Sequence, residues 1–191
     1  MHTWVWIIVA IAVVVCVIAV LAAAQQQRRT RLRSTFGPEY DRTVESSGGR
    51  RQAERELSGR LERRKQLDIR PLGEEQRRRY SADWNGVQAR FVDAPHDAVQ
   101  EADTLVSAVM RDRGYPMGDF EQRAADVSVD HGRAIDRYRA AHEISQRSAA
   151  GTASTEDLRQ AMVHYRVLFA ELLDSGAAGD RERETDQARV R

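Results

Sequence analysis

Residues 154–173, STEDLRQAMVHYRVLFAELL, hold the clearest structural signal in the sequence. Their apolar side chains recur every three or four positions, which is the period of one face of an α-helix: Leu158, Ala161, Met162, Tyr165, Leu168, Phe169, Leu172 and Leu173. Ser154, followed three residues later by Asp157, is typical of a helix N-terminus. The stretch therefore predicts an amphipathic helix that buries one complete face against other helices.

Four similar segments precede this helix, so that it has partners to pack against. The first, about residues 74–92, places Tyr80, Trp84, Val87 and Phe91 on one face. The others run from Pro95 to Gly114, from Asp119 to about Val127, and over about 132–148, with Asp119 and Gln122 resembling a capping box. Because no window alternates with the period of a strand, we predict an all-α fold whose residues 74–175 form a bundle of about five helices.

The regions on either side of the predicted bundle are too polar for a core of their own. Residues 28–73 form a basic, charged helical stalk and linker that ends in the Pro/Gly segment 67–73. Its apolar stripe is narrow, which suits a stalk, a short two-stranded coil or a helix laid on a partner. Residues 176–191 have no large apolar residue except Val190, so we predict a disordered tail.

Charge is distributed unevenly along this chain of 191 residues, although its net charge is only +1. Residues 25–80 carry 15 Arg and one Lys against nine acids, a net +7, whereas residues 81–175 carry ten Arg against 16 acids, a net −6. Pairing of the basic stalk with the acidic bundle, within one chain or between chains, uses this asymmetry most economically. The basic residues Arg60, Arg63, Arg64, Lys65 and Arg77–Arg79 also suit phosphate, but Tyr80 and Trp84 are better explained as core, so nucleic acid is an improbable partner.

The N-terminal residues 4–24, WVWIIVAIAVVVCVIAVLAAA, contain no charged side chain. At about 1.5 Å per residue they make a helix of about 31 Å, close to the hydrocarbon thickness of a bilayer. We therefore predict a single-pass transmembrane anchor, or signal-anchor, over residues 1–27. Indole rings prefer the membrane interface, and arginines prefer the cytoplasmic side of the membrane. The predicted membrane-interface residues are therefore Trp4 and Trp6 at one end of the span and Arg28, Arg29, Arg31 and Arg33 at the other. This orientation predicts a cell-membrane protein with most of its chain in the cytoplasm.

A cleaved secretory signal is the competing interpretation, because Ala22–Ala24 offers small residues for signal peptidase. Two features oppose it: no Lys or Arg precedes the apolar run, and the run exceeds the usual length of a signal peptide core. The single cysteine, Cys16, excludes an intramolecular disulfide and a cysteine-based zinc site, and we interpret it as a small apolar residue within the span.

Histidines and paired carboxylates are the only candidates for chemistry. His131, His142 and His164 fall on three helical segments, and no two of them have the short spacing of a metal-binding pair. Asp126 and Asp130 share a helix face, but Arg123 and Arg133 nearby make a solvated, ion-paired face the simpler interpretation. Phosphate loops, nucleophile elbows and Cys/His dyads are absent from the sequence. We therefore expect no enzymatic activity, no catalytic, cofactor-binding or metal-binding residues, and no cofactor.

Several segments carry a resemblance to a known type of protein: residues 36–42 (FGPEYDR), 84–93 (WNGVQARFVD), 113–126 and 154–165 (STEDLRQAMVHY). Over about residues 30–173 the chain resembles a family of uncharacterised, membrane-anchored helical proteins of high-GC, actinobacterial-type bacteria. The resemblance implies no activity, and it implies that the linker and the bundle belong to one unit.

Two hypotheses of different classes follow. The first is a membrane-anchored interaction or scaffold module, whose partners are the lipid bilayer and a protein, or a second copy, bound through the stalk. The second is an envelope-associated enzyme or a ligand- or metal-binding module with a pocket near His131, His142 and His164.

Overall fold

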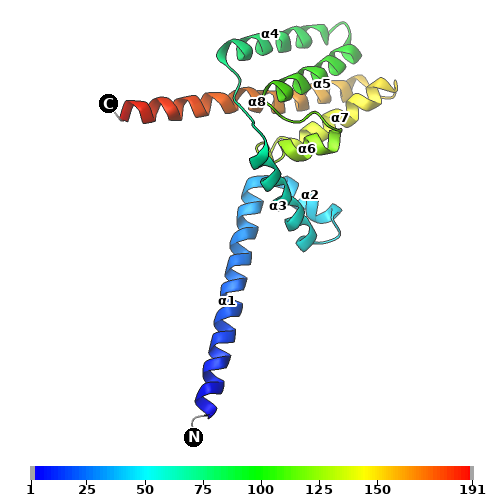
Figure 1. Ribbon diagram of the computed structural model, residues 1–191. Coiled ribbons are helices and arrows are strands. Elements are labelled where there is room, and N and C mark those ends of the chain that lie inside the picture. The colour runs from blue at the N-terminus through cyan, green and yellow to red at the C-terminus, as the bar shows by residue number, and fades with distance from the viewer. Residues whose placement is uncertain (1–2, 190–191) are drawn as a thin grey trace. The chain divides into compact units, whose positions relative to one another are not determined.

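Helices account for all the regular secondary structure in the computed structural model of the chain (Figure 1). The structure describes the backbone of residues 3–189 and the side chains of residues 4, 6 and 13–174. Eight helices and no strand occur over residues 3–189, which confirms the predicted all-α fold. The chain divides into two compact units, Met1–Ser58 and Gly59–Arg191.

The first unit contains α1 (Thr3–Phe36), α2 (Pro38–Ser46) and the first half of α3 (Arg50–Gln66). Gly37 separates α1 from α2 with a φ of 54°, a left-handed conformation that glycine adopts without steric cost. Pro38 then occupies the first turn of α2, where its missing N–H is not needed. The sequence of this junction therefore explains why the chain turns there.

A small apolar cluster holds the first unit together. Five side chains, each at most 2% exposed, form it: Leu32, Phe36, Tyr40, Ala53 and Leu57. The prediction that the stripe on residues 40–61 is too thin for a core is wrong in this respect. The residues that pack against this stripe, Leu32 and Phe36, lie near the C-terminal end of α1 and complete the cluster. They were missed from the sequence because α1 was not predicted to continue beyond the apolar run to Phe36.

The second unit is the helical bundle. Its helices are α4 (Glu74–Arg90), α5 (Pro95–Asp112), α6 (Phe120–Val127), α7 (Ile135–Ala149) and α8 (Thr155–Arg189). Helix α8 packs against α7 and α5, and α4 packs against α5 (Figure 1). The bundle of residues 74–175 predicted from apolar periodicity is thus confirmed as helical, and Tyr80, Trp84 and Val87 lie in its core.

Two of the predicted helix starts have the expected caps. The Asp119 carboxylate accepts a hydrogen bond from the Gln122 backbone N–H at 2.8 Å. Asp157 N–H donates to the Ser154 hydroxyl at 3.2 Å, while Ser154 N–H donates to the Asp157 carboxylate at 2.9 Å. These reciprocal bonds satisfy backbone donors that a helix leaves unpaired at its start.

The Pro/Gly segment before α4 lies against the end of α5. Arg70 N–H donates to the Arg113 carbonyl at 2.8 Å, and Leu72 is 3% exposed. Gly114, with a φ of 94°, allows this approach, because a Cβ atom there would stand 2.4 Å from the carbonyl oxygen of Asp68. The segment is therefore packed onto the bundle.

The predictions for the two ends of the chain concern residues whose side chains partly lie outside the described part. Helix α8 continues to Arg189, but side chains from residue 175 onward lie outside the described part, so the predicted disorder of residues 176–191 stays a prediction. The predicted anchor, residues 1–27, includes residues 1–3, 5 and 7–12, whose side chains also lie outside it. Within the described residues, no helix combines the length and the apolar character that crossing a membrane requires.

Candidate functional site

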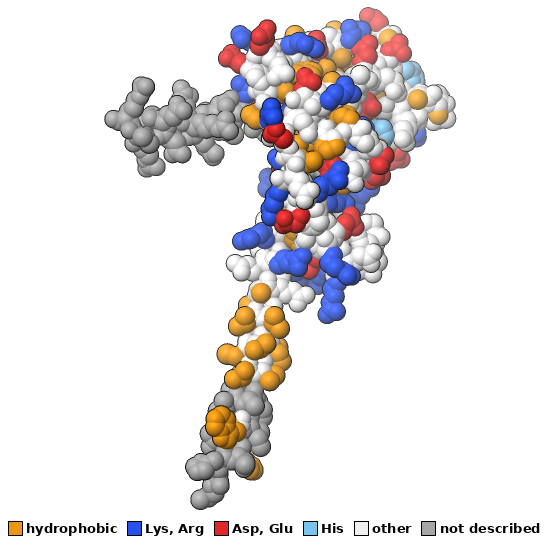
Figure 2. Space-filling model, in the orientation of Figure 1, with side chains coloured by type: hydrophobic (Ala, Val, Ile, Leu, Met, Phe, Trp, Pro, Cys, Tyr) orange, Lys and Arg blue, Asp and Glu red, His pale blue; other side chains and the backbone are white. Residues whose placement is uncertain are grey.

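The most unusual surface of the first unit is the uncovered apolar stretch of α1. Every side chain from residue 13 to residue 24 is exposed, and Figure 2 shows the apolar ones (orange) without covering side chains. Their exposed fractions lie between 51% and 66% for the large residues: Val13, Val14, Val15, Val17, Ile18, Val20 and Leu21. Trp4 and Trp6, two of the predicted interface residues, are 77% and 73% exposed. A helix that is apolar on all faces is typical of an apolar environment rather than of water.

The four arginines that follow have different local environments. Arg28 donates to the Ser58 hydroxyl at 2.7 Å, and Arg33 pairs with Asp41 at 2.8 Å while its guanidinium lies 5.6 Å from the centre of the Tyr40 ring. The Arg31 side chain is exposed and has no hydrogen-bond or ion-pair partner among the described residues. The membrane-interface role of these arginines stays a prediction.

Arg29 lies near the buried Tyr40 of the first unit. Burial of Tyr40 and its hydrogen bond to Glu54, 3.0 Å long, raise the pKa of the Tyr40 hydroxyl, and Arg29 opposes that rise. Arg29 also lines an open groove of about 430 Å³ on α1, together with four other polar residues whose aliphatic atoms contribute to its surface: Gln26, Thr30, Arg33 and Ser34. The groove therefore concentrates hydrogen-bond donors directly after the apolar stretch.

The first of the three predicted histidines, His131, is buried in the bundle. Its Nδ1 atom lies 3.1 Å from a carboxylate oxygen of Glu171 on α8. Burial lowers the pKa of His131, and the nearby Arg113 guanidinium lowers it further, against the opposing effect of Glu171. His131 is thus held toward its neutral form by its surroundings.

The second histidine, His142, belongs to a polar cluster of α5, α7 and α8. Its Nδ1 atom is 3.5 Å from the Asp103 carboxylate, and its ring stacks on Phe120 with centroids 3.7 Å apart. The Tyr165 hydroxyl donates to the same carboxylate at 2.8 Å. Burial alone would raise the pKa of Asp103, but the hydrogen bonds from His142 and Tyr165 prevail and lower it.

Tyrosines complete this cluster. Burial and the Asp103 charge raise the pKa of Tyr165, and burial raises the pKa of Tyr138 to about 12. The Tyr138 hydroxyl accepts a hydrogen bond from Arg123 at 3.1 Å. These hydroxyls therefore stay protonated at neutral pH, with Tyr165 donating a hydrogen bond and Tyr138 accepting one. Sequence analysis missed Asp103, although its position beside Ala102 on the buried stripe of α5 was the available signal.

The third histidine, His164, lies on α8 and has neither Glu171 nor Asp103 among the neighbours that shift its pKa. Burial and the charge of Arg137 lower its pKa. The three histidines thus have different neighbours, and in the described part of the chain no group of three or more His, Cys, Asp or Glu side chains is arranged to hold a metal ion.

Asp126 and Asp130 bind the second half of α3. Arg63 donates to Asp126 at 2.7 Å, and Arg64 donates to Asp130 at 2.5 Å. Tyr115 adds a hydrogen bond to Asp130 at 2.7 Å, and burial together with Asp130 raises the pKa of the Tyr115 hydroxyl. The two carboxylates are therefore ion-paired structural groups. This is an intramolecular pairing of stalk arginines with bundle acids.

The predicted phosphate-contacting arginines 77–79 are also engaged locally. Arg78 and Arg79 lie 3.6 Å and 3.9 Å from Glu74 and Asp83, one turn away on α4. The exposed Lys65 pairs with Glu62 at 2.8 Å. Such exposed pairs contribute little to stability, and the prediction that nucleic acid is not a partner stays a prediction.

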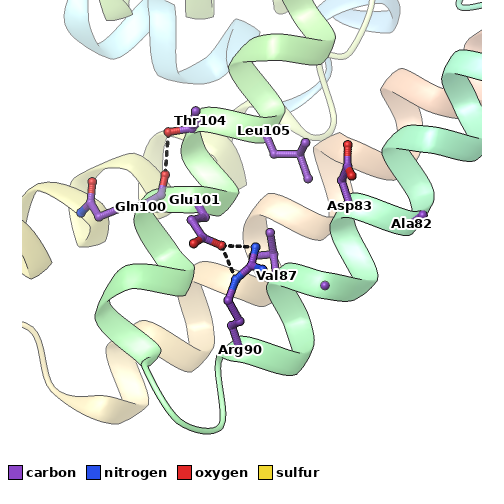
Figure 3. Close-up of a pocket in the computed structure, with 9 residues that line it drawn as sticks. Ala82, Asp83, Val87, Arg90, Gln100, Glu101, Thr104 and Leu105 are labelled. Carbon is purple, nitrogen blue, oxygen red and sulfur yellow. Dashed lines mark hydrogen bonds and ion pairs between the residues drawn. The ribbon is translucent and has the colours of Figure 1, made fainter.

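An open groove of about 460 Å³ lies between α4 and α5 (Figure 3). Val87 and Leu105 give it an apolar floor, and Arg90 joins the two helices by bonds of 2.7 Å and 2.5 Å to Glu101. Asp83 is the third charged residue that lines the groove.

Searches with protein-family models, among curated proteins and among solved structures found no match to this chain. The resemblance to membrane-anchored actinobacterial proteins therefore stays a prediction from the sequence.

Proposed function

We propose that this protein is a single-pass membrane protein that presents its helical bundle in the cytoplasm as a non-enzymatic interaction or scaffold module. The observation that carries the proposal is the uncharged run of residues 4–24, followed after three glutamines by arginines. A run of this length matches the hydrocarbon core of a bilayer, and flanking arginines favour the cytoplasmic side. The side chains of residues 5 and 7–12 lie outside the described part, so the anchor rests on the sequence over those positions.

The cost of leaving α1 in water supports the anchor. Burying a large aliphatic side chain stabilises it by about 1.5–3 kcal/mol relative to full exposure. The seven aliphatic side chains between Val13 and Leu21 are each more than half exposed, and the helix has no polar face over this stretch. A lipid environment removes that cost, while the helix satisfies its own backbone hydrogen bonds.

The polar groups of the bundle support a non-enzymatic role. Asp126, Asp130 and Glu101 are ion-paired with arginines, and Asp103 binds Tyr165 and His142. These contacts join different helices of the bundle, which fits a structural role for the groups that make them. What the bundle offers a partner is therefore its surface.

Membrane fractionation of the full chain tests the anchor. We expect the protein to stay in the membrane pellet after an alkaline carbonate wash, and a variant lacking residues 4–24 to be released. The deletion leaves the arginines in place, so it separates insertion from electrostatic adsorption. Release of the intact chain by the wash would exclude the anchor.

A reporter fusion tests the orientation. A reporter that is active only outside the cytoplasm, fused after Arg191, should be inactive, and one that is active only in the cytoplasm should be active. The opposite pattern would overturn the cytoplasmic placement while leaving the anchor intact.

Co-purification of two differently tagged copies tests self-association through the stalk. We expect co-purification from mild detergent, and its loss when the exposed Arg51 and Arg55 are both changed to Glu. Changing the exposed Arg133 and Arg137 of the bundle to Glu is the matched control, because it alters the same number of charges. Equal loss in both variants would point to a general charge effect instead of a stalk interface.

A second candidate function, ligand or metal binding near His131, His142 and His164, is favoured by the Asp103–His142 pair. A carboxylate that orients an imidazole is a common arrangement at metal and acid–base sites. Retention of stoichiometric metal by the purified full chain, lost in His142→Ala, would favour it. Equal metal content in both proteins would argue against it.

A further inference from the structure

We propose that the α1 groove, lined by Gln26, Arg29, Thr30, Arg33 and Ser34, binds the phosphate group of an anionic phospholipid in the cytoplasmic leaflet. This inference rests on the proposed membrane anchor and names the lipid chemistry that the anchor recognises. Arg29 and Arg33 are its anion ligands.

The five lining residues share one face of α1. At about 100° per residue, their positions fall within an arc of about 140° on the helix. Arg29 and Arg33 are one turn apart, so their guanidinium groups project from the same side of the helix. An open volume of about 430 Å³ lies over this face.

The groove also lies at the right distance from the apolar run. Arg29 is five residues beyond Ala24, or about 7.5 Å along the helix axis. The polar headgroup layer on each side of a bilayer is about 5–7 Å thick. If residues 4–24 fill the hydrocarbon core, the Arg29 guanidinium is therefore level with the lipid phosphates.

Arg29 contacts the Tyr40 hydroxyl through a side-chain hydrogen bond, so an anion would share its guanidinium with that contact. Arg33 pairs with Asp41 at 2.8 Å, but the two side chains are 52% and 57% exposed, and such pairs are weak. A phosphate can therefore share or replace Asp41 as the partner of Arg33. Guanidinium groups bind phosphate oxygens through two parallel N–H bonds, which favours arginine over a diffuse cation.

The hydroxyl groups of Thr30 and Ser34 contribute less than the arginines to binding of the anion. Thr30 donates to the Gln26 carbonyl at 3.0 Å, and Ser34 donates to the Arg31 carbonyl at 2.9 Å. Their protons are thus used by the helix backbone. Recognition of the anion is therefore assigned to Arg29 and Arg33, and the small side chains of Thr30 and Ser34 leave room for it.

Arg31 provides a matched control within the same helix turn. Its side chain is exposed and has no hydrogen-bond or ion-pair partner among the described residues, and its position is about 140° from Gln26 around the helix, outside the arc of the groove. Diffuse attraction of the arginines to a charged surface would make Arg29 and Arg31 equivalent. If the groove is a specific site, substitution of Arg29 should reduce lipid binding more than substitution of Arg31, although each substitution removes one charge.

The experiment uses the full chain in nanodiscs made of phosphatidylcholine and phosphatidylglycerol. After transfer to detergent, native mass spectrometry counts the phosphatidylglycerol molecules that stay bound to the protein. We expect one retained lipid, about fivefold less retention for Arg29→Gln, and near-normal retention for Arg31→Gln. A parallel arm offers inorganic phosphate to the chain in phosphatidylcholine alone.

The outcomes separate the possible sources of the anion. Equal loss in Arg29→Gln and Arg31→Gln, or no retained phosphatidylglycerol, would overturn the proposed site. Binding of inorganic phosphate that depends on Arg29 in neutral lipid would assign the site to a soluble phosphate and would also overturn the lipid proposal. Failure of the chain to insert into nanodiscs would instead refute the anchor, so the two proposals fail in distinguishable ways.

Discussion

The two halves of α3 are fastened by different chemistry. In the first unit, Ala53 and Leu57 are fully buried in the apolar cluster with Phe36 and Tyr40. In the second unit, Arg63 and Arg64 hold the other half by charge-assisted hydrogen bonds to Asp126 and Asp130. The same helix therefore depends on burial of apolar surface in one half and on ion pairs in the other.

The two halves of α3 should therefore respond differently to added salt. Apolar burial is insensitive to moderate salt, whereas ion pairs with an exposed member are screened by it. Arg63 is 46% exposed and its partner Asp126 is 1% exposed, so solvent reaches only one side of that pair. Salt and single substitutions should therefore act on the two halves separately.

Leu57→Ala is expected to have the largest effect. Removing a fully buried leucine leaves a cavity and costs about 2–5 kcal/mol. In so small a cluster this loss should release α2 and the first half of α3. Hydrogen exchange of the full chain measures it as faster exchange at residues 38–58, with little change in α4–α8.

The control for this substitution is the exposed Arg51→Ala on the same half of α3. It should leave exchange at residues 38–58 nearly unchanged. Equal acceleration by both substitutions would mean that the cluster around Leu57 is not what holds the first unit together.

Arg63→Ala should have the second-largest effect. It leaves the buried Asp126 carboxylate with only the Gln122 amide at 3.0 Å as a hydrogen-bond donor in its place, so we expect a cost of about 1–3 kcal/mol. A double-mutant cycle with Asp126→Ala measures the coupling by denaturant unfolding. The coupling should shrink at about 1 M salt, where the Debye length is about 3 Å.

A salt-independent coupling between Arg63 and Asp126, or none at all, would contradict the assignment of this half of α3 to ion pairing. Leu57→Ala serves as the reference, because its cost should not fall when salt is added.

Acidification should produce a smaller effect, confined to the second unit. Burial lowers the folded-state pKa of His131 below its usual 6.5, and burial likewise lowers that of His164. Below about pH 6.5 the unfolded chain therefore binds more protons than the folded one, and the free energy of unfolding falls as the pH drops. Residues 13–58 contain no histidine, so this part of the first unit lacks the contribution; the one histidine of that unit, His2, lies outside the described residues.

His131→Gln checks the sign of that pH dependence. The variant should lose part of the fall in bundle stability between about pH 7 and pH 5.5, because glutamine does not titrate there. A bundle that becomes more stable on acidification over this window would show that the Glu171 contact dominates His131, contrary to the account.

Apolar periodicity was enough to predict the helices of the bundle. Tyr80, Trp84 and Val87 on α4, and Leu158 to Leu173 on α8, were recognisable because each lies on one helical face. The first unit was missed for a physical reason. Its cluster draws Leu32 and Phe36 from the end of a helix whose apolar run points to a membrane, and neither residue looks like core in its own segment.

The polar contacts were less predictable. Overall charge asymmetry indicated that basic stalk and acidic bundle should pair, but it did not identify Arg63 and Arg64 as the residues that do so. Asp103 was overlooked because an aspartate beside a buried stripe has the same sequence signature as a surface aspartate. Such choices depend on which loops bring helices together, which periodicity does not encode.

The most direct measurement of the central claim, the membrane anchor, uses the only cysteine of the chain. Cys16 is exposed in the structure and lies near the middle of residues 4–24. In intact membranes a membrane-impermeant maleimide should not label Cys16 until the protein is denatured, whereas a Cys16→Ser, Gln52→Cys variant should be labelled once the membranes are opened. Ready labelling of Cys16 in native membranes would contradict the account.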